Sequence, residues 1–268
     1  MILGNFRALA GLVLACAASL HAVSVINVTT STTVFKDNFE NGTFTPSVGS
    51  WSVVGPDVTI SSAPVPGPAE GTFYASLFRD SNTPSQGNLQ ASFTPQSTAG
   101  NIILLRMMIY LNVGDNNDAR AQLILDDGDF TSARAWARPD GFGHVMAVET
   151  GGSPGTFVEV NTGLLYTPGV WQEWDLQYAV GASTFSLTVN GASASGFASV
   201  STGAVSKADL FNGVANPGGT FFLDAVPTAV TGTPEPGSVL LAGFGLALVA
   251  GVTRRAARRR PTASGARS

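Results

Sequence analysis

Short apolar runs separated by Gly, Pro, Asn, Asp and Ser fill the chain between residues 23 and 232, without a long stretch of helical period. In residues 184–191, for example, Phe185, Leu187 and Val189 alternate with polar residues. This period of two places one set of side chains on each face of a strand. Similar runs predict further strands at residues 72–80, 88–93, 101–113, 119–125, 133–138, 143–149, 156–161, 171–180 and 220–226.

About ten or more strands at this spacing, joined by turns rich in Gly and Pro, are typical of an all-β domain. We therefore predict that residues 23–232 form a single antiparallel β-sandwich of the jelly-roll type. The region is long enough for one sizeable core.

The N-terminal end departs from the strand pattern. Arg7 is followed by an apolar run over residues 8–20 and then by small residues, which is typical of a secretory signal peptide. We predict a signal helix in residues 1–22, with cleavage after Ala22 and an alternative site after Ser19. Lipidation of Cys16 is a further alternative, although Leu14 stands where a lipidation motif usually has a small residue.

The C-terminal end departs from it as well. Residues 238–252 carry no charge, and a helix of that length reaches roughly 22 Å, against roughly 30 Å for the bilayer core. Two prolines precede the run and an arginine block follows it, which argues against a buried core helix. We predict a transmembrane helix at 237–253, a cytoplasmic basic cluster at 254–260 and a disordered tail at 261–268.

The order of these C-terminal features resembles the PEP-CTERM sorting signal of Gram-negative bacteria, here spanning residues 233–260. The resemblance implies export through the secretion translocon, an inner-membrane intermediate, processing by an exosortase-type enzyme, and release to the cell surface or extracellular matrix. The residues that carry it are Pro234, Glu235, Pro236, Arg254, Arg255, Arg258, Arg259 and Arg260.

The charge of the body differs from that of the whole chain. Residues 23–232 hold seven Lys or Arg and seventeen Asp or Glu, a net charge of −10, whereas the full chain has a net charge of −4. Nucleic-acid binding needs a basic patch, so we exclude nucleic acid as a partner. Cys16 is the only cysteine and lies in the predicted signal peptide, so the exported chain forms no internal disulfide.

Residues 169–192, which read GVWQEWDLQYAVGASTFSLTVNGA, resemble a hairpin of laminin-G and concanavalin A-like jelly rolls, and residues 35–51 resemble a first strand of such sandwiches. The resemblance implies a secreted, carbohydrate-binding domain associated with exopolysaccharide. It also implies a structural calcium ion between the first and last strands, with Asp37, Glu40 and Asp224 as ligands. Acid-rich turns at 114–118 and 126–130 offer more oxygen ligands, unless they simply form turns.

Sugar sites combine aromatic faces with polar groups, so Trp171 and Trp136 are candidate ligand-binding residues. Trp171 and Trp174 are three residues apart and face opposite sides of a regular strand. If Trp174 lies in the core, we expect Trp171 to be exposed. Tyr166 is a further aromatic candidate.

Catalytic signals in the body are weak. His144 is its only histidine, and a lone histidine in a strand is usually structural. Glu173 and Asp175 share one face of a strand, as the carboxylates of some concanavalin-like glycosidases do, but Gln177 stands where those enzymes add a third acid. We expect a non-catalytic matrix protein that binds exopolysaccharide or is purely structural. The alternative is a secreted glycan-active hydrolase on the same fold.

Replacing Pro234, Glu235 and Pro236 by alanine is expected to leave the protein membrane-bound and unprocessed, because the triplet would no longer be recognised. The intact mass in membrane and extracellular fractions measures this, with alanines at residues 230–232 as the control. Release of the triplet variant at the normal mass would show that the triplet is not the sorting signal.

Overall fold

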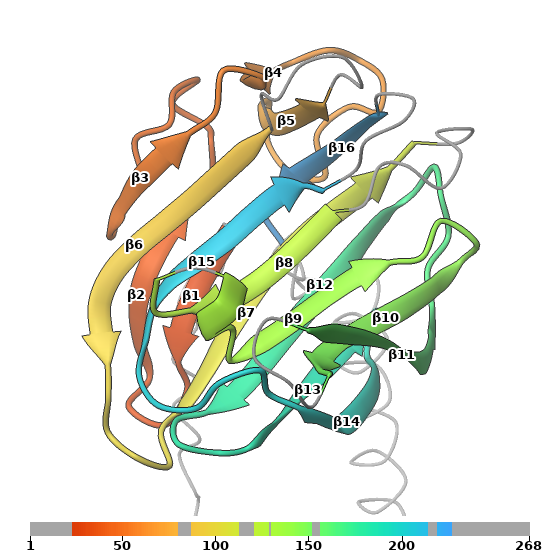
Figure 1. The fold of residues 1–268 in the computed structure, drawn as a ribbon. Helices are drawn as coiled ribbons and strands as arrows, with labels where there is room; N and C mark the ends of the chain where they lie inside the picture. The colour runs from red at the N-terminus through yellow and green to blue at the C-terminus, as the bar shows by residue number, and fades with distance from the viewer. Residues whose placement is uncertain are drawn as a thin grey trace, which may run out of the picture. The chain divides into compact units, whose positions relative to one another are not determined.

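The computed structural model describes residues 23–79, 87–112, 121–128, 130–151, 156–213 and 219–226. Within these residues the chain forms two antiparallel sheets and one short 3-10 helix, η1 (Phe130–Ser132) (Figure 1). The predicted all-β sandwich is thereby confirmed, and its arrangement is consistent with a jelly roll. None of the helices in this described part is long and apolar enough to cross a membrane. The predicted signal helix, transmembrane helix, sorting residues and tail lie outside the described residues.

The first sheet, which we call sheet A, is built around a central strand. Its strands are β1 (Val23–Asn27), β2 (Thr32–Asp37), β4 (Val58–Ser61), β5 (Tyr74–Arg79), β7 (Ile102–Leu111), β12 (Trp171–Ala179), β13 (Thr184–Val189), β14 (Ala192–Ala198) and β16 (Gly219–Asp224). The order is β14-β13-β12-β7-β16-β5-β4, and β1 pairs with β7 and with β2. Along one edge, β7 therefore pairs with β1 over its first half and with β16 over its second half.

The second sheet, which we call sheet B, lies in front of β7 and β12 in Figure 1. Its strands are β3 (Ser50–Val54), β6 (Asn88–Gln96), β8 (Ala121–Asp126), β9 (Ala135–Pro139), β10 (His144–Thr150), β11 (Phe157–Leu165) and β15 (Val205–Asn212). Their order is β11-β10-β9-β8-β15-β6-β3, and β8 and β6 flank β15.

Each predicted run from residue 72 onward contains a strand of the structure, within a few residues at either end. The pattern missed β1, β4, β14 and β15. The sequence of β14, ASASGFA, shows little difference in hydrophobicity between its two faces. In β15, Lys207 and Asp209 lie on one face, and the small Ala208 lies on the other. Alternation is hard to recognise where small residues occupy the buried positions.

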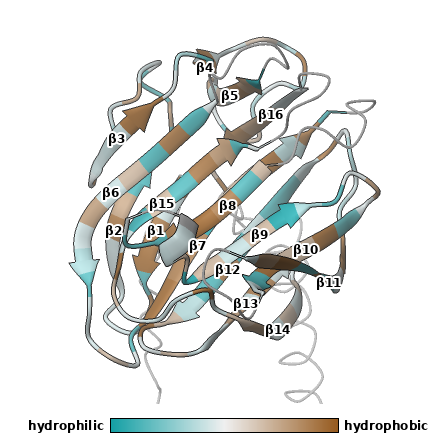
Figure 2. Cartoon of the chain, viewed as in Figure 1, coloured by the Kyte–Doolittle hydropathy of each residue, from teal (hydrophilic) through white to brown (hydrophobic). Residues whose placement is uncertain are grey.

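The core lies between the two sheets and is supplied by alternate residues of each strand. Along β6 this alternation is visible as successive brown and teal bands (Figure 2). On β12, Trp174, Leu176 and Tyr178 point inward, and the Trp174 side chain is only 1% exposed. Trp174 therefore lies in the core, which is the condition under which we expected Trp171 to be exposed.

Trp174→Ala is expected to lower the free energy of unfolding by about 3–5 kcal/mol, since it opens a large cavity in the core. Gln177→Ala is the control, because Gln177 is exposed on the opposite face of the same strand, and its effect should stay within about 0.5 kcal/mol. Urea unfolding of the two variants measures both values. Equal stability would contradict the assignment of Trp174 to the core.

Candidate functional site

The outer face of sheet A carries the two carboxylates that the sequence places on one face of a strand. The register of β12 on β7 pairs Asp175 with Arg106, Glu173 with Met108 and Trp171 with Tyr110. On both strands these residues alternate with residues of the core cluster, so their side chains lie on the face turned away from the core, where Met108 is covered by its neighbours.

Arg106 holds both carboxylates. Its Nε and a terminal nitrogen lie 2.9 and 2.8 Å from the two oxygens of Asp175, a bidentate pair. The same Nε lies 3.2 Å from an oxygen of Glu173. The side chains of Glu173, Arg106 and Asp175 are 35%, 25% and 13% exposed, so solvent reaches Glu173 most easily.

The two acids differ in their surroundings. Partial burial, followed by the adjacent Asp175 carboxylate, raises the pKa of Glu173, and the Arg106 guanidinium opposes this shift. Hydrogen bonding to Asp175 raises the pKa of Arg106, so the guanidinium stays charged. Glu173 therefore keeps a proton more readily than an ordinary glutamate, while Asp175 is hydrogen-bonded to a cation.

A row of aromatic rings adjoins these charged groups. The Tyr110 ring lies 5.6 Å from Trp171 and 5.8 Å from Phe222, measured between centroids, and each contact is edge-to-face. The buried Tyr74 closes the group with contacts of 6.1 Å to Trp171 and 5.5 Å to Phe222. Trp171 Nε1 donates a hydrogen bond of 2.9 Å to the Gly67 carbonyl. The ring of Trp171 is therefore held in place and half-buried rather than fully exposed.

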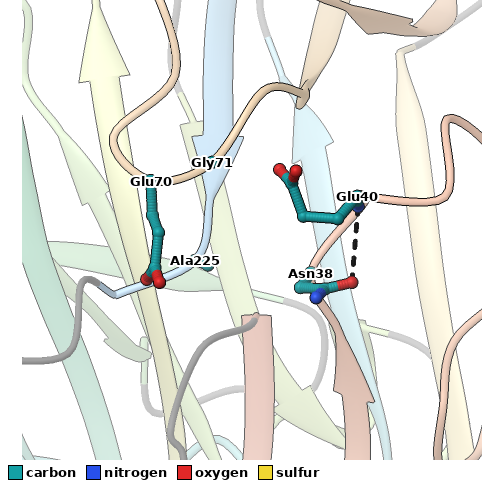
Figure 3. A pocket seen from close by; sticks show the side chains of 5 residues that line it. All are labelled: Asn38, Glu40, Glu70, Gly71 and Ala225. Carbon is teal, nitrogen blue, oxygen red and sulfur yellow. Dashed lines mark hydrogen bonds between the residues drawn. The ribbon is translucent and has the colours of Figure 1, made fainter.

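One predicted calcium ligand, Glu40, lines a second feature, a hollow of about 160 Å³ that is also lined by Asn38, Glu70, Gly71 and Ala225. Asp37 and Asp224 directly precede the lining residues Asn38 and Ala225 in the sequence. Glu40 and Glu70 lie on opposite sides of the hollow (Figure 3). The loop after β2 and the end of β16 do meet here, as the resemblance implied for the first and last strands.

The carboxylates of Glu40 and Asp224 accept hydrogen bonds from backbone N–H groups of the loop at residues 62–73. Glu40 accepts from Thr72 and Phe73, with distances of 3.0 Å. Asp224 accepts from Ala69 at 2.6 Å and Glu70 at 3.1 Å. Burial raises the pKa of Asp224 to about 7, although its backbone hydrogen bonds oppose the shift. The two acids together fasten the loop to the end of sheet A.

The third predicted ligand is engaged in the same way. Asp37 accepts from the Phe39 N–H at 2.9 Å and from Trp51 Nε1 at 2.6 Å. In the described part of the chain, His, Cys, Asp and Glu side chains form no group of three placed to hold a metal ion. Calcium binding by Asp37, Glu40 and Asp224 stays a prediction.

Trp136 lies on the other sheet, and only 9% of it is exposed. Its Nε1 donates to Gln122 at 2.6 Å, and its ring meets Phe157 edge-on at 5.0 Å. With Ile124, Val148 and other residues it forms a small apolar cluster on the outer face of sheet B. The expectation that Trp136 offers a face to a sugar is corrected, because packing covers the ring. Tyr166 is also buried.

Asp126 and Asp140 are two further acids, and each contacts neighbouring protein groups. On β8 and β15, burial and the neighbouring Asp209 carboxylate keep the pKa of Asp126 above its usual range. His144 Nδ1 lies 2.8 Å from Asp140, which also accepts the N–H groups of Phe142 and His144. Asp140 thus shapes the turn before β10, and the pair with His144 belongs to that turn.

The sequence reasoning found Glu173, Asp175 and Trp171 but missed Arg106, Tyr110 and Phe222. Arg106 stands in an apolar run with no acidic neighbour, so nothing in the sequence marks it. Only the register of β12 on β7 reveals its partners.

No protein-family model matches the chain, and no curated protein matches it. Several solved structures resemble it. An endo-β-1,4-glucuronan lyase from Trichoderma reesei is 12% identical with a TM-score of 0.46, covering 65% of this chain and 89% of that one. A PL-14 alginate lyase from Aplysia kurodai is 7% identical with a TM-score of 0.45, and the match covers 63% of this chain and 85% of that one. A Bacteroides ovatus GH16 protein of a mixed-linkage glucan locus is 10% identical with a TM-score of 0.41, covering 64% and 84%.

These matches contradict the prediction that the body has no enzymatic activity, because lyases stand among the structures that resemble it. We withdraw that prediction. At identities of 7–12% the matches assign no activity of their own to this chain. Its function has to be inferred from its own side chains.

Gly71→Ala is expected to lower the melting temperature by several degrees, equivalent to roughly 1–3 kcal/mol. Gly71 has φ +67°, and an added Cβ would lie 2.4 Å from the Glu40 carboxyl group that fastens the loop. Gly163→Ala is the matched control, since Gly163 has φ +77° but no atom within 4 Å of the added Cβ. If both variants melt alike in a thermal scan, the Glu40 contact does not stabilise the loop.

Proposed function

We propose that this chain is an exported glycan-active protein whose sandwich binds a polysaccharide on the outer face of sheet A and hydrolyses it there. The observation that carries the proposal is the pair Glu173 and Asp175, joined by Arg106 and bordered by the rings of Trp171 and Tyr110. Carboxyl groups and aromatic faces together are what glycoside hydrolysis requires.

The two carboxyl groups have the different environments that acid and base roles need. Glu173 has a raised pKa and is the more exposed, so it serves as the proton donor to the leaving sugar oxygen. Asp175, paired with the Arg106 guanidinium, serves as the second carboxylate, facing the positive charge that develops on the sugar ring. Arg106 positions both acids and does not itself exchange a proton.

The aromatic row supplies the binding surface. Trp171 and Tyr110 are partly exposed and lie two residue pairs along the register from Glu173, which is the next position on the same face. The apolar face of a sugar ring packs on such rings, while its hydroxyl groups reach the neighbouring polar side chains. The fastened loop at residues 62–73 holds Trp171 through Gly67, which keeps the ring in one orientation.

Sequence patterns near the two termini support an exported location. The signal-peptide pattern in residues 1–22 and the PEP-CTERM-like residues 233–260 support export and processing by an exosortase-type enzyme. The net negative charge of residues 23–232 favours solubility at the cell surface or in the matrix. We include exopolysaccharide as the partner that the site meets there.

Glu173→Gln is expected to lower the rate of reducing-end release from a hydrolysed polysaccharide by about 10²–10⁴-fold, because the amide cannot donate the proton. Glu159→Gln on β11 is the control and should keep the wild-type rate. In the wild type, the rate should fall as the pH rises through the raised pKa of Glu173, since the donor must be protonated. A Glu173→Gln enzyme with the wild-type rate and pH profile would exclude this role.

A further inference from the structure

The cations on the outer face of sheet A limit the charge of its ligand. Among the described residues of this face, Arg106 on β7 and Lys36 on β2 are the basic side chains, on either side of Ser24 in the register. The other described basic residues lie elsewhere. Arg134, Arg138 and Lys207 belong to sheet B and its loops, and Arg79 is bound to the Asn212 carbonyl.

The charge of Arg106 is already balanced by two carboxylates. Asp175 accepts two of its five N–H groups in a bidentate pair, and Glu173 lies 3.2 Å from the Nε. A carboxylate of a sugar would have to share this single positive charge with two acids that repel it. Lys36 is also engaged in an interaction of its own.

The acids of the face add repulsion. Glu173 and Asp175 place up to two negative charges where a sugar would lie, against the single charge of Arg106. The body between residues 23 and 232 has a net charge of −10, which repels a polyanion at longer range. The polar positions beside them, Gln177, Ser186 and Thr188, are uncharged groups that hydrogen-bond hydroxyls.

We propose that the polysaccharide recognised on this face is a neutral one, a chain of hexoses that carries hydroxyl groups but no carboxylate or sulfate groups. The inference rests on the proposed function, since it names the substrate class of the same site. The aromatic row and the uncharged polar positions bind the sugar, and Arg106, whose charge Asp175 and Glu173 already balance, gives uronic acids no unmatched cation.

Matched polymer pairs test the substrate class. Soluble β-1,4-glucan, β-1,3-glucan and β-1,4-mannan oligosaccharides are each compared with the product of their oxidation at C6, which adds a carboxylate and leaves the linkage unchanged. Binding and reducing-end release are measured with the processed protein at low and at physiological salt. We expect binding and release from at least one neutral member, and binding at least tenfold weaker for its oxidised partner.

A second variant tests the reason for the preference. Asp175→Asn frees the Arg106 guanidinium, so binding of the oxidised polymers should rise by about tenfold at low salt, the effect of one charge-assisted hydrogen bond. Asp127→Asn removes the same charge from an exposed position beside sheet B and should leave binding unchanged. Because binding is measured, the loss of hydrolysis in Asp175→Asn does not affect the test.

The outcomes separate the two proposals. Preference for the oxidised member of a pair overturns the neutral-glycan inference and leaves the site on sheet A standing. Failure to bind or cleave any member of any pair overturns the proposed function and the inference with it. If Asp175→Asn binds oxidised polymers no better than Asp127→Asn does, Arg106 is not what excludes uronic acids, and the inference falls.

Discussion

The shared edge of β7 is the constraint on which the rest of the structure depends. One edge of this strand pairs first with β1 and then with β16, while the other edge pairs with β12 along nearly its whole length. The beginning and the end of the body are therefore held to one strand. Because β7 is central, its inward residues fix the core and its outward residues fix the surface that we assign to function.

Two consequences follow from that pairing. The end of β16 and the loop after β2 come together, so Asp224 and Glu40 can fasten the loop at residues 62–73. The register of β12 sets Asp175 opposite Arg106, so an ion pair forms on a face that would otherwise carry an isolated guanidinium. A shift of one residue would turn Glu173 and Asp175 into the core, where two acids without partners are strongly unfavourable.

Sequence reasoning could reach the local features of this fold. The alternation in residues 171–180 places Trp171 and Trp174 on opposite faces, and in the structure Trp174 is buried while Trp171 is half-buried. The same reasoning could not see contacts between distant segments. Trp136 looked available, but Phe157 and Gln122 cover it from other strands.

The predicted calcium ligands illustrate the same limit. Their neighbourhood follows from the meeting of the first and last strands, which a family resemblance can suggest. The direction of each carboxylate depends on which N–H groups reach it, and those N–H groups belong in part to a loop with no recognisable pattern. The same limit applies to Arg106 on sheet A, because its pairing with Asp175 depends on the register of β12 on β7, which the sequence alone does not give.

The indole N–H signals of the four tryptophans, followed by NMR during a titration with neutral oligosaccharides, test the central claim most directly. Single Trp→Phe variants assign the signals. The account predicts that the Trp171 signal shifts progressively while the Trp136 signal, on the other sheet, stays in place. A shift confined to Trp136, or unchanged signals with an oligosaccharide that the protein is known to bind, would contradict a glycan site on the outer face of sheet A.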